Sequence, residues 1–288
     1  MDRDHFIIYV YCLVCQYYQE IVMLHPLRRR GFPPSLSDEE VVTMEICGEY
    51  FGFDEDEAIY AYFRKHYGEW FPELRDRTVF VRQAANLWQV KAWIQHRLTV
   101  VSKQATDPIQ PIDTLPLPVC VYTRSKRDRC FKPDADYGYC AAKDLHYYGF
   151  KLGLRISQAG MIIHYSLLPA RPHDIQLVDD LLDGFQGVAP ADKGFIDAFR
   201  QQALAQKGVE MVTPARKNMD AQPPVSLQRI CRRLRKRIET VGSQLTKRYA
   251  IAETRTRDLW HYQHRLIRKI LSHTICVFIN LQLGRPPL

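Results

Sequence analysis

The stretch G-V-A-P-A-D-K-G-F-I-D-A-F-R-Q-Q-A-L-A-Q-K-G-V-E-M-V-T, residues 187–213, decides the fold class of this chain. Its first residues, 187–191, form a short apolar run that predicts a buried strand. Asp192 follows at the start of a glycine-containing turn, residues 196–207 have helical spacing, and a second short strand is predicted over 209–213. This order indicates a mixed α/β domain, in which functional groups gather at the carboxyl ends of strands.

The segments on either side extend this pattern. The expected elements are a strand over 111–121, a β-hairpin over 151–157 and 161–168, an amphipathic helix over 174–185 with Asp174 as its N-cap, a long basic helix over 226–249, and a helix ending at Asn280. Asp197 is expected to cap the helix that it precedes. Together these elements predict a central mixed sheet flanked by helices, forming a domain over residues 106–288.

Residues 1–105 predict an all-helical N-terminal domain. Ser37 and Glu40 have the capping-box spacing S-x-x-E, and further helices are expected over 54–67 and 79–98. Short helices before an enzyme domain favour a DNA-binding module slightly over a dimerisation or scaffold region. The candidate phosphate contacts in this region are Arg82, Lys91, Arg97 and Lys103.

The basic residues of the chain are concentrated near its C-terminus. The net charge is +8, and residues 223–288 alone hold 14 Lys or Arg and 3 Asp or Glu, a local balance of +11, which leaves −3 for the rest. A polyanion such as DNA fits this asymmetry, because neutralising phosphates releases counterions. A solvated basic helix explains it about as well.

The cysteines and the N-terminal apolar run point to an ordinary cytoplasmic protein without a membrane partner. Cys12 and Cys15 form a C-x-x-C motif without a second metal-binding pair, which favours core cysteines over zinc ligands. The apolar run over residues 6–15 is too short to span a bilayer and lacks the flanks of a signal peptide.

Three carboxylates have unusual local contexts. Asp113 lies inside an apolar strand-like run, Asp192 ends a strand before a turn, and Glu239 is a single acid among basic residues of the long helix. Such carboxylates suit divalent metal ions, which take hard oxygen ligands. Two ions about 3.5–4 Å apart stabilise the attacking and leaving oxygens of a phosphoryl transfer. The competing interpretation of Glu239 is a surface salt bridge, which is common and weak.

Cationic side chains share the helical face of Glu239. Arg232 and Arg235 lie seven and four residues before it, and Ser243 and Thr246 lie four and seven residues after it. Such cations suit DNA phosphates. The predicted DNA contacts are Arg216, Lys217, Arg232, Arg235, Lys236 and Lys247.

Other acids and histidines have simpler expected roles. His146 precedes the hairpin, where an approach to DNA or to the metal site is a minor alternative, and His173 opens the helix that Asp174 is expected to cap. The acids expected on the surface are Asp134, Asp136 and Asp144 in a loop rich in Lys, Arg and Tyr, and Asp179, Asp180 and Asp183 on the polar side of a helix.

Five blocks of the sequence resemble, in order, those of bacterial insertion-sequence DDE transposases, with the greatest likeness to insertion sequence family 982. The blocks are P-I-D-T-L-P-L-P-V-C (111–120), H-Y-Y-G-F-K-L-G-L-R-I (146–156), A-D-K-G-F-I (191–196), T-P-A-R-K-N-M (213–219) and R-I-E-T-V-G-S-Q-L (237–245). The resemblance implies a ribonuclease H-like catalytic domain with Asp113, Asp192 and Glu239 as catalytic residues and ligands of two Mg²⁺ ions, for which Mn²⁺ substitutes. It also implies action as a homo-oligomer on terminal inverted repeats and target DNA, in the bacterial nucleoid.

The residues around the last acid depart from the Tyr, Arg, Glu, Lys signature of related families. Arg235 matches the arginine, Arg232 stands at the tyrosine position, and Thr246 stands at the lysine position, with Lys247 one place later. Gly242 stands where an aromatic residue is expected. Two alternatives to an active transposase therefore stay open: a nuclease of the same fold without strand transfer, and a catalytically decayed DNA-binding protein.

Overall fold

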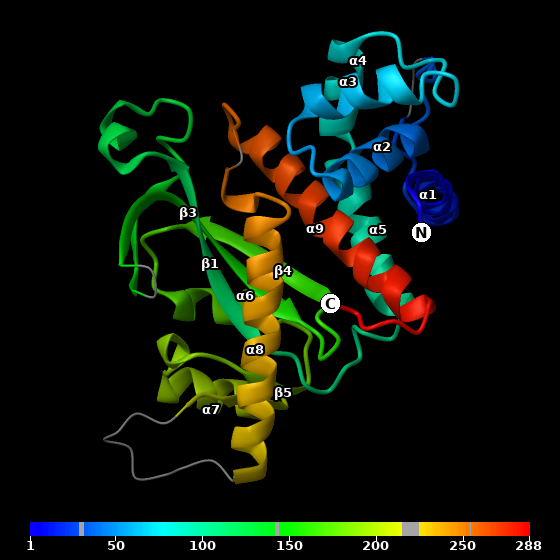
Figure 1. Cartoon of the computed structure of the whole chain (residues 1–288). Coiled ribbons are helices and arrows are strands. Elements are labelled where there is room, and N and C mark those ends of the chain that lie inside the picture. Colours follow the sequence, from blue (N-terminus) through cyan, green and yellow to red (C-terminus); the bar gives the residue numbers. More distant parts are fainter. Residues whose placement is uncertain (29–31, 142–143, 215–224, 254) are drawn as a thin grey trace.

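The computed structural model describes residues 1–28, 32–141, 144–214, 225–253 and 255–288, which form a sheet region and a helical region (Figure 1). Arg216 and Lys217, two of the predicted DNA contacts, lie outside these described residues.

The N-terminal helices pack around a buried apolar core. They are α1 (Arg3–Leu24), α2 (Asp38–Phe51), α3 (Asp56–His66), α4 (Arg77–Asn86) and α5 (Trp88–Val101). The predicted capping box is confirmed, since the Ser37 side chain accepts from the Glu40 backbone and Glu40 accepts from the Ser37 backbone. The single helix expected over 79–98 is two helices, because the chain breaks at Leu87, whose buried side chain joins the core.

An antiparallel sheet follows, with β3 (Leu145–Ile156) at its centre. One edge of β3 pairs with β1 (Ile112–Cys120), and the other pairs first with β2 (Asp136–Cys140) and then with β4 (Ile162–Pro169). The predicted hairpin is confirmed, although its first strand starts earlier than residue 151 and includes His146.

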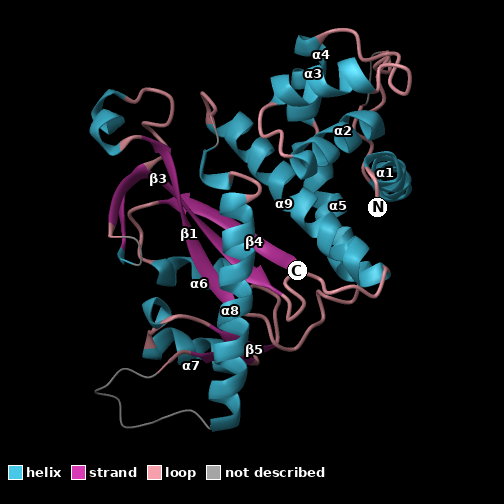
Figure 2. Cartoon of the chain, viewed as in Figure 1, coloured by secondary structure: helices cyan, strands magenta, loops and turns pink. Residues whose placement is uncertain are grey.

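A second, parallel pair continues the sheet beyond β1. It consists of β5 (Gly187–Pro190) and β6 (Val209–Val212), joined through α7 (Ala198–Gln206). Ile109, just before β1, forms a parallel bridge to Val188 of β5. The strands therefore follow one another in space as β4, β3, β1, β5 and β6, as the magenta strands of Figure 2 show in part. The mixed α/β prediction is confirmed. The start of β1 lies close to the carboxyl end of β5.

Two long helices cover the sheet and connect it to the helical region. Helix α8 (Val225–Lys247) runs along the front of the strands in Figure 1, and α9 (Leu259–Gln282) starts above the top of α8 and runs down beside α5. The N-terminal half of α9 packs in the sheet core through Tyr262 and Ile270, and its C-terminal half packs in the helical core through Ile275. Helix α9 thus belongs to both cores.

The predicted helix over 174–185 is wrong in length. The chain forms a short 3₁₀ turn, Asp174–Leu177, and then α6 (Val178–Leu181), and it leaves the helical path at Gly184, whose φ is +64°. The N-cap is His173 rather than Asp174, because the Asp174 carboxylate pairs with Lys151 of β3 at 2.6 Å. Asp197 caps α7 as expected, by accepting from the Arg200 backbone at 3.0 Å.

The two cysteines of helix α1 lie outside the buried core, contrary to expectation. All eight cysteines are free, and Cys12 is exposed and Cys15 half-buried, so the prediction of core cysteines is wrong. Their positions on α1 face away from the buried residues such as Val10 and Val14. By length and composition alone α1 would be long enough to cross a membrane, a test that core helices and signal sequences also pass.

Candidate functional site

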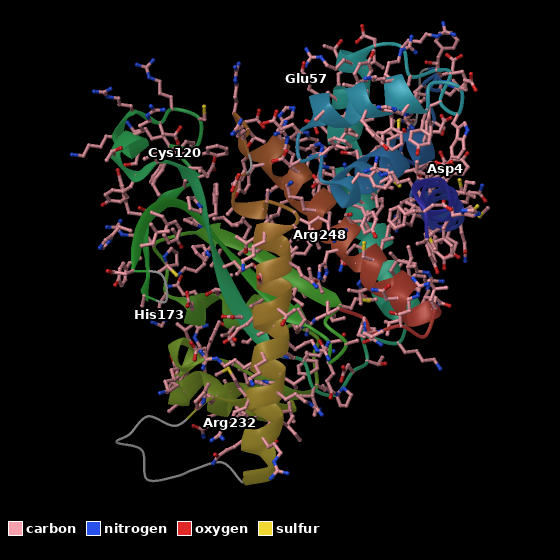
Figure 3. The ribbon with its side chains drawn as sticks, in the orientation of Figure 1. Asp4, Glu57, Cys120, His173, Arg232 and Arg248 are labelled. Atoms are coloured by element: carbon pink, nitrogen blue, oxygen red, sulfur yellow. The ribbon has the colours of Figure 1, made fainter. Side chains whose placement is uncertain are left out.

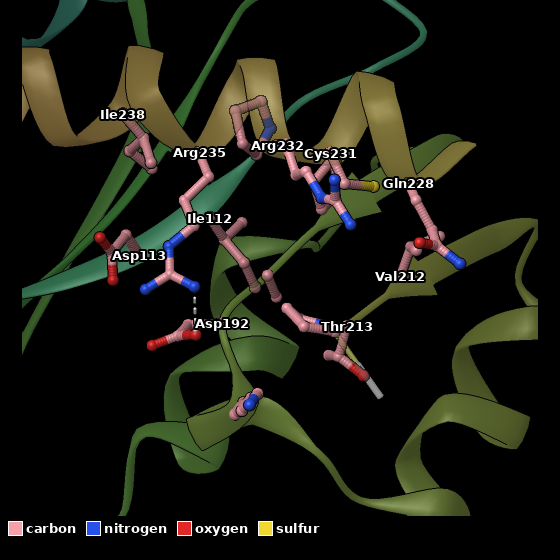
Figure 4. Close-up of a pocket in the computed structure, with 15 residues that line it drawn as sticks. Ile112, Asp113, Asp192, Val212, Thr213, Gln228, Cys231, Arg232, Arg235 and Ile238 are labelled. Atoms are coloured by element: carbon pink, nitrogen blue, oxygen red, sulfur yellow. Dashed lines mark ion pairs between the residues drawn. The ribbon is translucent and has the colours of Figure 1, made fainter. Parts of the chain in front are cut away.

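Asp113 lies near the start of β1, at the edge of a cavity below α8 (Figure 4). Its carboxylate accepts from the backbone N–H of Thr114 at 2.8 Å. The pKa of this carboxyl is raised from 3.8 to about 6, chiefly by burial and also by the nearby charge of Asp192, against the opposing effects of the Thr114 hydrogen bond and of Arg235. A carboxylate desolvated in this way gains from any cation that reaches it.

Asp192 follows β5 directly and lines the same cavity. Its Oδ1 lies 3.1 Å from Nη1 of Arg235, whose Nε donates to Oε1 of Glu239 at 3.0 Å. All three side chains are about half exposed. Figure 4 shows the guanidinium of Arg235 reaching down from α8 to a position between Asp113 and Asp192. One cation therefore connects two of the predicted catalytic acids and faces the third.

The position of Glu239 differs slightly from that of the two aspartates. Asp113 and Asp192 line the cavity itself, whereas Glu239 lies in an adjoining groove on α8 with Arg232, Arg233 and Lys236. Arg235 borders both spaces. The three acids are thus grouped around Arg235, with Glu239 at the rim.

Helix α8 is held against the sheet by the face that adjoins Arg235 and Glu239. Leu234, Ile238, Val241 and Leu245 are buried, which turns Arg235 and Glu239 toward the strand ends. Gly242 meets β1 closely, since a Cβ at this position would lie 3.0 Å from Leu115 Cδ2. A side chain at position 242 would crowd Leu115, so the glycine allows this close approach of α8 to β1.

The predicted DNA-contacting cations that the structure describes lie on α8. Arg232, Lys236 and Lys247 are exposed on α8, and Arg232 also lines the cavity. The hydroxyl of Thr246, at the signature's lysine position, donates to the carbonyl of Gly242 within the helix.

One N-terminal candidate for phosphate contact is excluded by its burial. Lys91 is fully buried, and its Nζ lies 2.7 Å from Oε2 of Glu45 and 2.8 Å from Nδ1 of His264. Arg97 is exposed but pairs with Glu20 at 2.9 Å, while Arg82 and Lys103 are exposed. The prediction for Lys91 is therefore wrong, because Glu45 of α2 and His264 of α9 enclose its ammonium group.

A fourth acid lies near the site and was not expected there. The Asp174 carboxylate accepts from the hydroxyl of Thr114 at 3.3 Å, pairs with Lys151, and raises the pKa of Asp113. No local pattern in the sequence predicted this position for Asp174, because its partner Lys151 is distant in the sequence and approaches it only in the folded chain.

A separate group of possible metal ligands lies between the helices. Glu45, Asp56 and His264 are buried, with ligand atoms within 4.8 Å of one another. However, Lys91 already contacts Glu45, and Arg268 lies 3.6 Å from Glu45 and contacts Asp56. These two cations neutralise the acids, so a divalent ion fits this group less well than it fits the acids around Arg235.

The family of the chain follows from a comparison with known protein families. Residues 103–259 match the family model described as a transposase DDE domain, which covers just over half of the 288 residues. The chain therefore belongs to the DDE transposase family. The matched segment contains Asp113, Asp192 and Glu239. No curated protein and no solved structure matches the chain.

Proposed function

We propose that this protein is a DDE transposase that cleaves DNA at the terminal inverted repeats of its insertion sequence and joins the ends to target DNA. The observation that carries the proposal is the convergence of Asp113, Asp192 and Glu239 on the single guanidinium of Arg235. The family supports a transposase acting on DNA, and DDE transposases generally use divalent metal ions.

We further infer that the domain is ribonuclease H-like and that residues 1–105 form a separate helical domain. The spatial order β4, β3, β1, β5, β6, with β1 antiparallel to β3 and parallel to β5, supports the first inference. The helical core that residues 6–98 form supports the second, although α9 completes that core. The greatest likeness of the motifs remains to insertion sequence family 982.

The carboxylates fit two Mg²⁺ or Mn²⁺ ions because a cation already occupies the space that they share. Asp113, Asp192 and Glu239 are the proposed ligands, and such ions supply charge stabilisation for the attacking and leaving oxygens. The guanidinium of Arg235 stands in for that positive charge. Once displaced from the acids, it is placed to hold a DNA phosphate through two parallel N–H donors.

The exposed face of α8 gives the DNA a path to the cavity. Arg232, Lys236 and Lys247 present positive charge on this face, and we propose that they hold the backbone on either side of the scissile phosphate. Arg216 and Lys217 remain proposed contacts from the sequence. The partners would be element ends and target DNA, bound by a homo-oligomer in the bacterial nucleoid.

The test is cleavage of labelled element-end DNA in the presence of Mn²⁺ by the wild type and by Asp192→Asn. We expect Asp192→Asn to lower the cleavage rate by at least about 1,000-fold, since it removes a ligand charge worth several kcal/mol in the transition state. Asp180→Asn is the matched control, because Asp180 is also exposed but lies on α6 beside His164.

Three outcomes would point away from the proposal. Cleavage that survives in Asp192→Asn would contradict the site. Cleaved ends that never join to target DNA would favour a nuclease of the same fold. Specific binding of the ends without cleavage by the wild type would favour a decayed copy that has kept only its DNA-binding function.

A further inference from the structure

An exposed aromatic surface lies at the end of β1 opposite to Asp113. It consists of Tyr122, just after β1, of Tyr137 and Tyr139 on β2, and of His146 on β3, and we call it the aromatic surface. The three tyrosines are 41–52% exposed, although large aromatic side chains are usually buried. The residue that separates the β2 tyrosines is Gly138, so both rings project from the same side of an edge strand.

The rings hold one another in place. The ring of Tyr139 lies 4.7 Å from that of its cross-strand partner His146, and the ring of Tyr122 lies 5.8 Å from Tyr137. The hydroxyl of Tyr139 donates to Asp144 at 2.8 Å, and that of Tyr137 lies 3.1 Å from the Ser125 hydroxyl. The surface is therefore preorganised, so a flat ligand that stacks on it need not order the side chains.

Unpaired positive charge surrounds the aromatic surface. The adjoining segment 121–132 carries one acid, Asp128, and five exposed basic residues that form no ion pair within the described parts of the chain: Arg124, Lys126, Arg127, Arg129 and Lys132. Figure 3 shows nitrogen-tipped side chains pointing outward from the loop near the labelled Cys120. By contrast, the exposed Arg97 and Arg75 are both paired with glutamates.

A groove runs from the aromatic surface toward the candidate active site and ends at Asp174. Its lining runs from Tyr122 and Tyr139 to Lys151 and Asp174, and Asp174 accepts from the hydroxyl next to Asp113. The strand from Asp113 to Cys120 spans roughly 25 Å at about 3.3 Å per residue. A chain of nucleotides with its phosphate at Asp113 would have to be several nucleotides long to reach the rings.

We propose that the aromatic surface binds unpaired nucleotides of the DNA, stacking their bases on Tyr122 and Tyr139 while segment 121–132 holds their phosphates. Exposed rings combined with exposed cations suit single-stranded nucleic acid, because every base has a stacking face and the backbone carries phosphates. A duplex hides those faces, so the rings select DNA with an unpaired end. This proposal rests on the proposed function, because DNA cutting at Asp113 and Asp192 would bring such ends to the groove.

The test is binding of full-length protein to fluorescent DNA in EDTA, which separates binding from cleavage. The two probes are a duplex and the same duplex with a single-stranded extension that contains 2-aminopurine. We expect the wild type to prefer the extended probe and to change its 2-aminopurine fluorescence. Tyr122→Ala and Tyr139→Ala should each weaken binding of the extended probe by roughly 10-fold and the plain duplex hardly at all.

Two further variants control the experiment. Tyr139→Phe keeps the ring and should keep the preference, which separates stacking from the hydrogen bond to Asp144. Trp70→Ala removes an aromatic ring of similar exposure, 44%, from the helical region and should leave both affinities unchanged. Arg124→Gln should reduce the salt dependence of binding by a slope of about 0.7, as expected for one lost phosphate contact.

Several results would overturn the proposal. Equal losses on both probes in the alanine variants, or unchanged fluorescence of 2-aminopurine on binding, would exclude base stacking. Binding of an acidic peptide in preference to the extended probe would assign the surface to a protein partner. Because binding is measured in EDTA, where no cleavage takes place, a failure of the catalytic assignment would leave this measurement intact.

Discussion

Two regions of this molecule bring acids and arginines together, and they differ in burial and in charge balance. Between the helices, Glu45, Glu49 and Asp56 meet Lys91, Arg268 and Lys269, with all six side chains no more than 5% exposed. We call this group the buried charge network. At the strand ends, three acids surround Arg235, which is half exposed.

The charge balance tells the two regions apart. In the buried charge network each acid contacts at least one cation, and Arg265 adds a further contact to Asp56 at 2.8 Å. The pKa of the buried Asp56 carboxyl is lowered, because Arg268 and neighbouring donors outweigh the effect of burial. Burial lowers the pKa of His264 to about 4, so this ring is neutral at neutral pH. In the buried charge network the acids are matched by cations, whereas acids in excess at an open cavity leave negative charge for a ligand.

Replacing Arg268 should lower the free energy of unfolding far more than replacing Arg235. Arg268→Met leaves Glu49 and Asp56 buried without their main partner, and we expect the free energy of unfolding to fall by about 3–5 kcal/mol. Urea denaturation followed by circular dichroism measures this. Arg235→Met is the matched control and should cost at most about 1 kcal/mol, because its ion pairs are half exposed. Similar losses in the two variants would show that the comparison is wrong.

Replacing Asp113 should stabilise the protein in a pH-dependent way. The pKa of this carboxyl is raised from 3.8 to about 6, mainly by burial, so its ionisation is disfavoured in the folded state. The resulting cost is absent below pH 3.8, grows between pH 3.8 and 6, and is constant above pH 6. Asp113→Asn removes it, and we expect a gain of up to about 3 kcal/mol at pH 7.5 and almost none at pH 3.8.

Urea denaturation at several pH values measures that difference. Asp197→Asn serves as the control, because an asparagine side chain accepts the same capping hydrogen bond at α7 and the change should leave the stability nearly unchanged. A constant difference between Asp113→Asn and the wild type from pH 4 to 7 would contradict the prediction.

Replacing Arg235 should have the smallest effect, on ion affinity. The guanidinium competes with a divalent ion for Asp192 and Glu239. Arg235→Gln should therefore tighten Mn²⁺ binding by roughly 2- to 10-fold, since each half-exposed pair contributes only about 0.2–1 kcal/mol. Electron paramagnetic resonance of free Mn²⁺ gives the affinity. Arg233→Gln on the same helix should leave it unchanged, and weaker binding by Arg235→Gln would mean that the arginine supports the ion.

The sequence predicted best those features that depend on neighbouring residues. Ser37 with Glu40 and Asp197 with α7 are caps whose partners lie within three positions, and both predictions are confirmed. The order of strands and helices followed from local periodicity in the same way. The N-cap expected at Asp174 is wrong because the carboxylate of Asp174 pairs with Lys151, a contact between distant residues.

The candidate site was harder to predict wherever tertiary contacts decide. Lys91 has the sequence context of an exposed helical lysine, but Glu45 lies 46 residues away from it and His264 lies 173 residues away. Gly242 looked like a departure from a motif until its approach to Leu115 gave it a packing role. The three acids followed from strand ends and motif blocks, and they remain a prediction that Asp192→Asn tests.

The buried charge network also sets an order for synthesis on the ribosome. Glu49 and Arg268 are separated by 219 positions, so the acids of α2 and α3 leave the ribosome long before their counter-charges. Glu45 can pair early with Lys91 of α5, but until α9 arrives the helical region cannot close around Glu49 and Asp56 without burying them uncompensated. We therefore expect nascent chains that stop before α9 to leave the helical region open and to be degraded.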